Sequence, residues 1–557
     1  MLLLLTLCVA SSLTTAAFLS PESMKDTEKT YQEGKLVTVE VAQGIIVGQE
    51  RTQSGYTYHS FESIPFAKPP TGERRFKDPE PSEPWGGDLN ATIHPPKCPQ
   101  FFVMGQEDCL YLNVFTPPDS IGRLEPLPVM FYIHGGAYYF GTSSQYNRGV
   151  VPLLQHDVIL VTTNYRLGVL GFLSTEDSAA PGNLGLKDQA LALRWVNENI
   201  EAFGGDVSRI TIFGESAGAA SVHYHQLIPS SAGLFSGAIM QSGNAFTAWS
   251  RGRDFQRVAQ QVGRRFNCST ESSEEMIACL QGKNAHLIDE KYVEFIEFNL
   301  QPVFFAPRVD GEYIPDDPVT LVKEGRYHHV PTMMGINRDE GAIFSQEMYW
   351  FRPVIDQLIE DFPKNGPISL HLYEDEDPVN TSIAIYDYYL GGLNFEYEDL
   401  GNLTMLYTDR FFGMPLDWLT QLISDEDEVY RWELRHRGEN SILDLIPGIN
   451  KTLSDPWIAH ADDLPYIFHP GLFGTPTSER DLIVSDLYTK LWTDFAKTRN
   501  PTPDGSLGFS WERTSRENLK KILITADLPL QMENDKKAEN RAFWDGLPLR
   551  INALRKS

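Results

Sequence analysis

The chain alternates between short apolar runs and longer segments with helical periodicity. Short, mainly apolar runs predict buried strands; they span residues 110–115, 128–133, 158–164, 209–213, 237–241, 331–336 and 429–437. Residues 183–203 and 482–498 instead carry apolar side chains at helical spacing. Strands that alternate with helices predict a mostly parallel sheet with helices on both faces, and so an α/β protein.

Three segments depart from this alternation. Residues 37–47 alternate apolar with polar positions, which predicts edge strands of a small N-terminal sheet. Residues 59–100 are rich in proline with aromatic residues between, which favours a long surface loop over a linker. Residues 342–430 are irregular, helical in parts and acidic. Because no repeat or linker divides the chain, we expect residues 18–557 to form one large domain with long insertions.

The first residues predict export. Residues 2–10 form an apolar stretch too short to cross a bilayer, and small residues follow, so residues 1–17 are typical of a signal peptide. The usual basic start is missing, which leaves a retained anchor as the alternative. Further along, the sequence has no long apolar stretch, hydrophobic tail or retention tetrapeptide. We therefore expect a secreted, extracellular protein without a membrane anchor.

The composition narrows the range of partners. The chain has 557 residues, enough for a large buried core, and a formal net charge of −28. A protein that binds nucleic acids or anionic membranes needs a basic surface patch, so this net negative charge argues against both as partners. A solvated acidic surface that keeps an exported protein soluble accounts for the charge.

Cysteines and glycosylation sequons agree with export. Cys8 leaves with the signal peptide, and the other four cysteines allow three pairings. The local pairs Cys98–Cys109 and Cys268–Cys279 are favoured because each closes a short loop. Zinc is the rival use, but the spacing and the oxidising compartment disfavour it. Asn-x-Ser/Thr sequons, as candidate glycan sites, begin at Asn90, Asn267, Asn380, Asn402 and Asn450.

The strongest chemical signal is a serine between two glycines. Residues 209–213 predict a strand, Gly214-Glu215-Ser216-Ala217-Gly218 follows, and small residues then begin a helix. Strand, sharp turn and helix with a serine at the apex are typical of a nucleophile elbow. An ordinary structural turn is the alternative, since a bare G-x-S-x-G motif is weak evidence.

A serine nucleophile needs a histidine base, and the base needs an acid that orients it. In elbow-containing folds the chain order is serine, acid, histidine. His223 and His225 follow Ser216 too closely for the role. His460 lies in a loop after a late predicted strand and fits best, with His469 as the alternative.

The acid and the oxyanion donors are expected after strands. Asp339 and Glu340 follow the strand at 331–336, and the sequence leaves the choice between them open. His134-Gly135-Gly136 follows a buried strand, as an oxyanion loop does, and Ala217 offers a further N–H group. An ordinary glycine turn is the alternative for the first of these.

Together these motifs resemble the type-B carboxylesterases, the carboxylesterase–cholinesterase family of α/β-hydrolases, from about residue 37 to residue 544. The landmark segments are residues 107–113, 134–136, 164–168, 182–189 and 214–218. The resemblance implies an α/β-hydrolase fold that requires no cofactor or metal. It also implies buried structural ion pairs, Arg75 with Glu107 and Arg166 with Asp188, and its early disulfides fall on the two local pairs.

The resemblance further assigns roles in the site. It implies Ser216 as nucleophile, Glu340 as acid and His460 as base. The oxyanion donors would be Gly135, Gly136 and Ala217. Phe305, Ile343 and Phe344 would line the substrate pocket.

The resulting hypothesis is a secreted serine carboxylesterase that hydrolyses small neutral carboxylic esters. The alternatives are an esterase for a juvenile-hormone-like terpenoid methyl ester, a slow-turnover ester sink, and a non-catalytic adhesion protein such as the neuroligins in this family. Residues 99–108, between the first cysteines, lack the tryptophan of cholinesterases, and Trp85 is expected to pack against the proline-rich loop. No oligomeric state follows from the sequence.

Overall fold

The computed structural model describes residues 32–100, 105–145, 149–299, 301, 303–393, 395–446, 449, 451–469 and 474–556. The expected signal peptide at residues 1–17 and the sequon at Asn450 lie outside these ranges. In the described part of the chain, 13 strands form one sheet, ordered β1-β2-β3-β5-β7-β6-β8-β9-β10-β11-β12-β13, with β4 paired to β2.

The strands are β1 (Gln32–Val41), β2 (Gly44–Gln53), β3 (Tyr56–Pro65), β4 (Asp88–Asn90), β5 (Tyr111–Thr116), β6 (Leu127–Ile133), β7 (Ile159–Thr163), β8 (Gly205–Glu215), β9 (Gly237–Gln241), β10 (Thr332–Asn337), β11 (Val429–Leu434), β12 (Lys521–Ile524) and β13 (Gln531–Glu533). From β7 to β12 all neighbouring strands run parallel. The predicted α/β class with a mostly parallel sheet is confirmed.

The helices are α3 (Val151–Leu154), α4 (Gly168–Phe172), α5 (Leu184–Asn199), α6 (Ala217–Leu227), α7 (Phe255–Arg265), α8 (Ser273–Gln281), α9 (Ala285–Asp289), α10 (Pro318–Lys323), α11 (Ala342–Trp350), α12 (Pro353–Glu360), α13 (Phe362–Ser369), α14 (Pro378–Leu390), α15 (Leu400–Thr408), α16 (Met414–Ile423), α17 (Lys451–Ser454), α18 (Leu464–Ile467), α19 (Glu479–Thr498), α20 (Ala538–Gly546) and α21 (Arg550–Lys556). In the described part of the chain, no helix is both long enough and apolar enough to span a bilayer.

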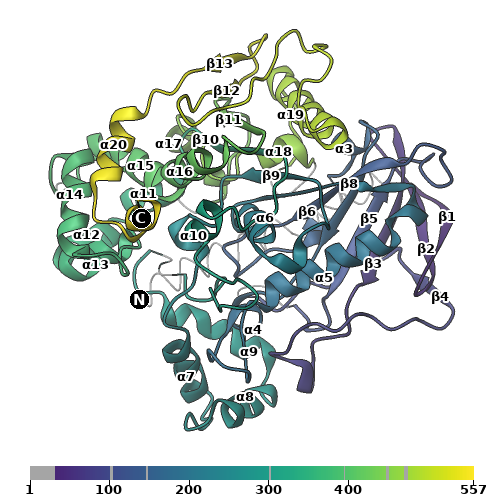
Figure 1. Cartoon of the computed structure of the whole chain (residues 1–557), viewed down its shortest axis with the longest axis horizontal. Helices are drawn as coiled ribbons and strands as arrows, with labels where there is room; N and C mark the ends of the chain where they lie inside the picture. Colours follow the sequence, from purple (N-terminus) through teal and green to yellow (C-terminus); the bar gives the residue numbers. More distant parts are fainter. Residues whose placement is uncertain are drawn as a thin grey trace.

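The two faces of the central strands pack against different helices (Figure 1). Along β6, Val129 and Phe131 belong to the apolar cluster shared with α5 and α6. Met130 and Tyr132 point the other way and belong to the cluster shared with α3 and α19. Successive side chains on a strand face opposite sides, so both faces of β6 are buried and every residue of it is apolar or small enough to pack there.

The N-terminal strands are the edge of the same sheet. β1, β2 and β3 pair antiparallel, and β3 joins them to β5, so the small N-terminal sheet is continuous with the central one. The prediction of a surface loop from residue 59 was wrong at its start, because β3 continues to Pro65. Polar Ser60 and Glu62 are fully buried in β3, where Glu62 pairs with Arg51 at 2.8 Å, so apolar alternation did not mark this strand.

Residues 342–430 are more helical than predicted, and they contain α11 to α16. Among these helices, α12, α13, α14 and α16 each begin with a proline in the first two positions. Proline is tolerated there because the first N–H groups of a helix have no partner within the helix. The short strands β12 and β13, the last two in the sheet order, were also not predicted.

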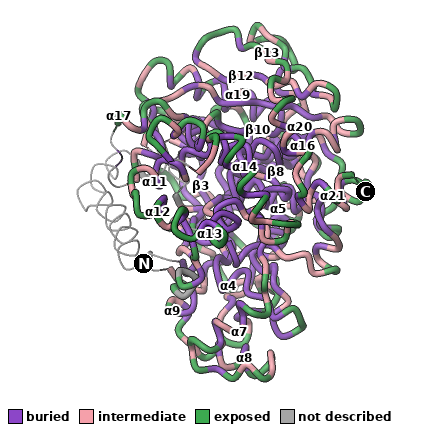
Figure 2. Tube along the Cα trace, turned by 90° about the vertical axis from the view of Figure 1, so that its left-hand side faces the viewer, coloured by how far each residue is buried: buried purple, intermediate pink, exposed green. Residues whose placement is uncertain are grey.

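Helices α7 and α8 extend away from the sheet as a separate lobe with many exposed residues (Figure 2). The disulfide Cys268–Cys279 lies in this lobe, and Cys98–Cys109 closes the loop before β5. Arg75 pairs with Glu107 at 2.6 Å and also donates to the carbonyl of Leu280 on α8. This arginine therefore ties the lobe to the loop that contains the first disulfide.

Surface positions also bear on the predicted modifications. The side chains of Asn90, Asn267, Asn380 and Asn402 are exposed. The sequons at these positions are therefore sterically open to glycan addition, which stays a prediction.

Candidate active site

Ser216 lies in a sharp turn between β8 and α6. Its backbone angles are φ 57° and ψ −123°, a conformation that residues other than glycine rarely adopt. Its N–H group donates to the carbonyl of Gln241 at 2.8 Å. Strain of this kind persists only where the surroundings impose it, and it concentrates at functional sites. The conformation is the one that a nucleophile elbow requires.

The two flanking glycines are required by packing. A Cβ atom on Gly218 would lie 2.0 Å from the carbonyl oxygen of Ile133, and one on Gly214 would lie 2.6 Å from the same oxygen. Both positions therefore bring the turn closer to β6 than any side chain allows.

His460 and Glu340 are in direct contact. Glu340 follows β10, His460 lies in the loop before α18, and His460 Nδ1 is 2.6 Å from Glu340 Oε2. Glu340 is fully buried, and its second oxygen accepts the N–H of Asn337 at 2.7 Å and the hydroxyl of Ser242. The carboxylate is thus held on both sides and aimed at the imidazole.

Asp339 faces away from the imidazole. Its carboxylate accepts the N–H of Ile458 at 3.0 Å and pairs with Arg338 at 2.6 Å, and its own N–H donates to the carbonyl of Ile458. Asp339 therefore stabilises the backbone at Ile458, two residues before His460.

Glu215 is a second carboxylate next to the imidazole. Its Oε1 lies 3.1 Å from His460 Nε2, the nitrogen opposite Glu340. Burial raises the pKa of Glu215 to about 8, against the opposing effect of His460. Burial alone would lower the pKa of His460, but Glu215 and Glu340 outweigh it and raise this pKa to about 9. The sequence had shown Glu215 only as part of the elbow motif.

Two further acids hold the His460 loop. Asp462 accepts the N–H groups of Ala459 at 2.8 Å and Ile442 at 2.9 Å, while Asp463 accepts from the side-chain amide of Gln241 at 2.5 Å. Burial raises the pKa of Asp462 to about 7 and that of Asp463 to about 6. Sequence reasoning missed both residues. Their only signal was two adjacent acids directly after a candidate base.

The glycine loop after β6 lies against the serine. A Cβ atom on Gly135 would lie 3.1 Å from Ser216 Cβ, and Gly136 has φ 107°, which favours glycine. Ala217 is the first residue of α6, where N–H groups have no partner within the helix. His134 stacks on Tyr165 at 4.4 Å, and burial lowers the pKa of His134 to about 4, so it is neutral.

An aromatic side chain packs against His460. The ring of Phe412 lies 4.8 Å from the imidazole, and Phe344 lies 5.3 Å from the adjacent Phe411. Phe305 is buried instead among Phe295 at 5.5 Å and Tyr139 at 6.4 Å, and Ile343 is half-buried at the start of α11. Of the three expected pocket residues, Phe344 packs against a chain neighbour of Phe412, the ring that contacts His460.

The other candidate histidines have different partners. His469 Nε2 lies 3.0 Å from the hydroxyl of Ser485, and His225 lies 3.0 Å from both Gln189 and Ser231. His223 accepts the N–H of Ala245 at 3.0 Å. Within the described ranges, no group of three or more His, Cys, Asp or Glu residues is arranged to hold a metal ion.

The chain is similar to known proteins over most of its length. The model of the carboxylesterase family matches residues 35–544. The chain is 35% identical over 544 residues to a juvenile hormone esterase of Tribolium castaneum, covering 90% of this chain and 92% of the relative. It is 35% identical over 488 residues to esterase FE4 of Myzus persicae, covering 84% of this chain and 85% of the relative.

A relative with a different kind of name also matches. Neuroligin-2 of Mus musculus is 34% identical over 502 residues, which cover 79% of this chain and 57% of the relative. The family model nevertheless spans nearly the whole chain, and named esterases match over most of their length. The chain therefore belongs to the carboxylesterase family, has its α/β-hydrolase fold, and is a carboxylic ester hydrolase.

Proposed function

We propose that this protein hydrolyses neutral carboxylic esters through an acyl-enzyme on Ser216, with His460 as base and Glu340 as acid. The observation that carries the proposal is the 2.6 Å contact between His460 Nδ1 and Glu340, with His460 Nε2 3.1 Å from Glu215 in the strained serine elbow. A carboxylate at this nitrogen fixes the imidazole tautomer that leaves Nε2 free to accept a proton.

Acylation begins with the Ser216 hydroxyl. Its oxygen attacks the ester carbonyl carbon while His460 Nε2 takes the hydroxyl proton. The carbonyl electron pair moves onto oxygen, and the N–H groups of Gly135, Gly136 and Ala217 receive this oxyanion. The carbon–oxygen bond to the alcohol then breaks, and the alcohol leaves with the proton from His460.

Deacylation repeats these steps with water. His460 takes a proton from water as the water oxygen attacks the acyl carbon on Ser216. The bond to Ser216 breaks, Ser216 recovers its proton from His460, and the carboxylic acid leaves. Glu340 stabilises the imidazolium that forms in both halves of the reaction.

The environment of the base favours uncharged substrates. The aromatic ring in contact with His460 is that of Phe412, and Phe344 packs against Phe411, the neighbour of Phe412 in the chain. The loop at 99–108 contains no tryptophan that could face a quaternary ammonium. A small neutral ester fits this setting better than a choline ester.

Two other functions are alternatives within the family: a more specific ester substrate and a binding role. The juvenile hormone esterase relative favours a terpenoid methyl ester as a candidate substrate. The neuroligin relative favours a binding role, but serine, histidine and glutamate all stand at the matched positions here. Secretion is part of the proposal, supported by the N-terminal signal pattern and two disulfides.

A chromogenic ester assay tests the proposal. Purified protein should release many equivalents of chromophore from a neutral acetyl ester, whereas a sink would release one and an adhesion protein none.

A second assay tests the preference for uncharged esters. It compares acetylthiocholine with an uncharged thioester of matched size by kcat/KM. A clear preference for acetylthiocholine would contradict the neutral-ester assignment.

A further inference from the structure

One π-helical turn, Asp409–Gly413, joins α15 to α16. At its end the N–H of Met414 donates to the carbonyl of Asp409, five residues back instead of four. Pro415 follows and has no N–H group, so the α-helical hydrogen bond to Phe411 cannot form. Single π-helical turns inside α-helices occur frequently at functional sites.

This turn contacts the base, and the end of α15 just before it contacts the residue that follows the acid. Phe412 on the turn lies 4.8 Å from the ring of His460. Gly341, which directly follows Glu340, donates its N–H to the hydroxyl of Thr408 at 2.9 Å. A Cβ atom on Gly341 would lie 2.3 Å from the carbonyl of Thr404 on α15, so the packing is close.

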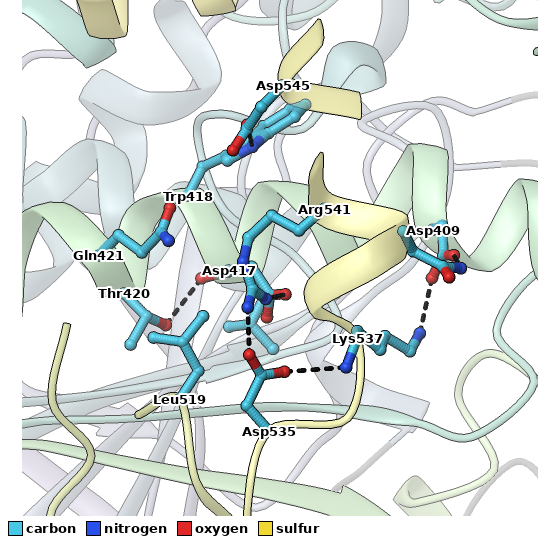
Figure 3. Close-up of polar contacts among 12 residues, drawn as sticks. Asp409, Asp417, Trp418, Thr420, Gln421, Leu519, Asp535, Lys537, Arg541 and Asp545 are labelled. Atoms are coloured by element: carbon cyan, nitrogen blue, oxygen red, sulfur yellow. Dashed lines mark hydrogen bonds and ion pairs between the residues drawn. The ribbon is translucent and has the colours of Figure 1, made fainter. Parts of the chain in front are cut away.

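The other side of the turn is held by the C-terminal segment (Figure 3). Asp409 is fully buried, and its Oδ1 accepts a hydrogen bond from Lys537 Nζ at 2.6 Å. Its Oδ2 accepts from Asn540 Nδ2 at 2.9 Å and from the hydroxyl of Tyr389 on α14 at 2.7 Å. Burial alone would lower the pKa of Lys537, but Asp409 outweighs it and raises this pKa, so the amine stays charged. We call the ion pair of Lys537 with Asp409 the 409–537 clamp.

The clamp packs directly on the backbone of the turn. A Cβ atom on Gly413 would lie 3.3 Å from Asp409 Oδ1 and 3.6 Å from Lys537 Nζ. The ion pair therefore lies beside the backbone at the end of the turn.

A second ion pair holds α20 independently. Arg541 on α20 pairs with Asp417 on α16 at 2.5 Å and also with Asp535, as Figure 3 shows. Asp417 in turn pairs with Arg431 on β11 at 2.5 Å. Because these contacts fix α20 on α16, the clamp can be removed without releasing the C-terminal segment.

We propose that Lys537 is a positioning residue for His460. Through Asp409 it fixes the π-helical turn, and Phe412 on this turn limits the rotation of the imidazole ring. Glu340 holds one edge of the ring at Nδ1, and Phe412 packs close to the ring, so together they aim Nε2. The inference rests on the proposed function, in which His460 is the base.

Lys537→Met and Lys536→Met form a matched pair for the test. Lys536 is the neighbouring residue, its side chain is 72% exposed, and it pairs only with Glu533 at the surface among the described contacts. Lys537→Met should lower kcat about tenfold, because small displacements of catalytic groups are costly, while KM changes less than about twofold. The rate at which a fluorophosphonate labels Ser216 should fall by the same factor, and Lys536→Met should change neither rate.

Two further variants separate positioning from a general loss of folding. Asp409→Asn with Lys537→Met removes both charges, so no buried charge is left unpaired; it should keep the melting temperature near that of the wild type and still show the lower kcat. In a Phe412→Leu background, Lys537→Met should lower kcat less than about twofold, because the contact that transmits the effect is already lost.

The possible results are distinct. Equal kcat values for Lys537→Met and Lys536→Met, wild-type kcat in the charge-free double variant, or an unchanged effect in the Phe412→Leu background would each overturn the positioning role alone. A wild-type protein without turnover would overturn the proposed function and the positioning role together.

Discussion

His460 lies between two carboxylates, and this arrangement determines how its charge depends on pH. Glu340 contacts Nδ1 at 2.6 Å and Glu215 contacts Nε2 at 3.1 Å. The proposed base must be uncharged before it can take a proton from Ser216. A raised pKa of about 9 for His460 opposes this, whereas a proton on Glu215, whose own pKa is raised to about 8, relieves it. Neutral His460 is therefore favoured when Glu215 carries no negative charge.

Glu215→Gln should move the acidic limb of the pH–rate profile to lower pH. The amide cannot carry the negative charge that raises the pKa of His460, so the imidazole loses its proton at lower pH. We expect the midpoint of the acidic limb in kcat/KM to fall by about one pH unit. A midpoint that rises or stays fixed would show that Glu215 does not act on the charge of His460.

The neighbouring residues Asp339 and Glu340 should behave differently on substitution. Glu340→Gln removes the charge that stabilises the imidazolium and should lower kcat by about 10³-fold or more. Asp339→Asn leaves that contact intact and should affect kcat less than about tenfold, mainly through the loop at Ile458. The assay is turnover of a neutral chromogenic ester, and the reverse ranking would move the acid role to Asp339.

At the scale of elements, the sequence predicted best where one physical constraint dominates. The buried strands β6, β7 and β9 are short apolar runs with both faces covered, and the elbow needs glycine on both sides of Ser216. β3 was missed because its buried polar residues find partners only in the folded protein. The contact of Glu215 with His460 and the clamp at Asp409 depend on residues far apart in sequence, so no local pattern could indicate them.

Gly218→Ala should damage the elbow. The added methyl group would lie 2.0 Å from the carbonyl oxygen of Ile133, so α6 or β6 must move. We expect a loss of about 1–3 kcal/mol in the free energy of unfolding and a large fall in kcat, because Ser216 moves with the helix.

Gly86→Ala is the matched control for this substitution. A Cβ atom on Gly86 meets no heavy atom within 4 Å, so denaturation and activity should both match the wild type. Wild-type stability and turnover in Gly218→Ala would contradict the packing argument for the elbow.

Over the whole molecule, one sheet brings together residues from distant parts of the chain. Ser216 follows β8, Glu340 follows β10, and His460 lies in a loop beyond β11, so parallel strands deliver all three to the same edge of the sheet. This is the edge at which open α/β sheets bind ligands. The C-terminal segment packs on α16, and its Lys537 pairs with Asp409 in the turn that carries Phe412.

The most direct measurement is turnover by Ser216→Ala, with Ser221→Ala one helical turn further along α6 as the control. If Ser216 carries the acyl group, Ser216→Ala should retain the fold by circular dichroism and lose hydrolysis of a neutral ester by about 10⁴-fold or more, while Ser221→Ala keeps most of it. A folded Ser216→Ala protein that still turns over the ester at a rate near that of the wild type would contradict the account.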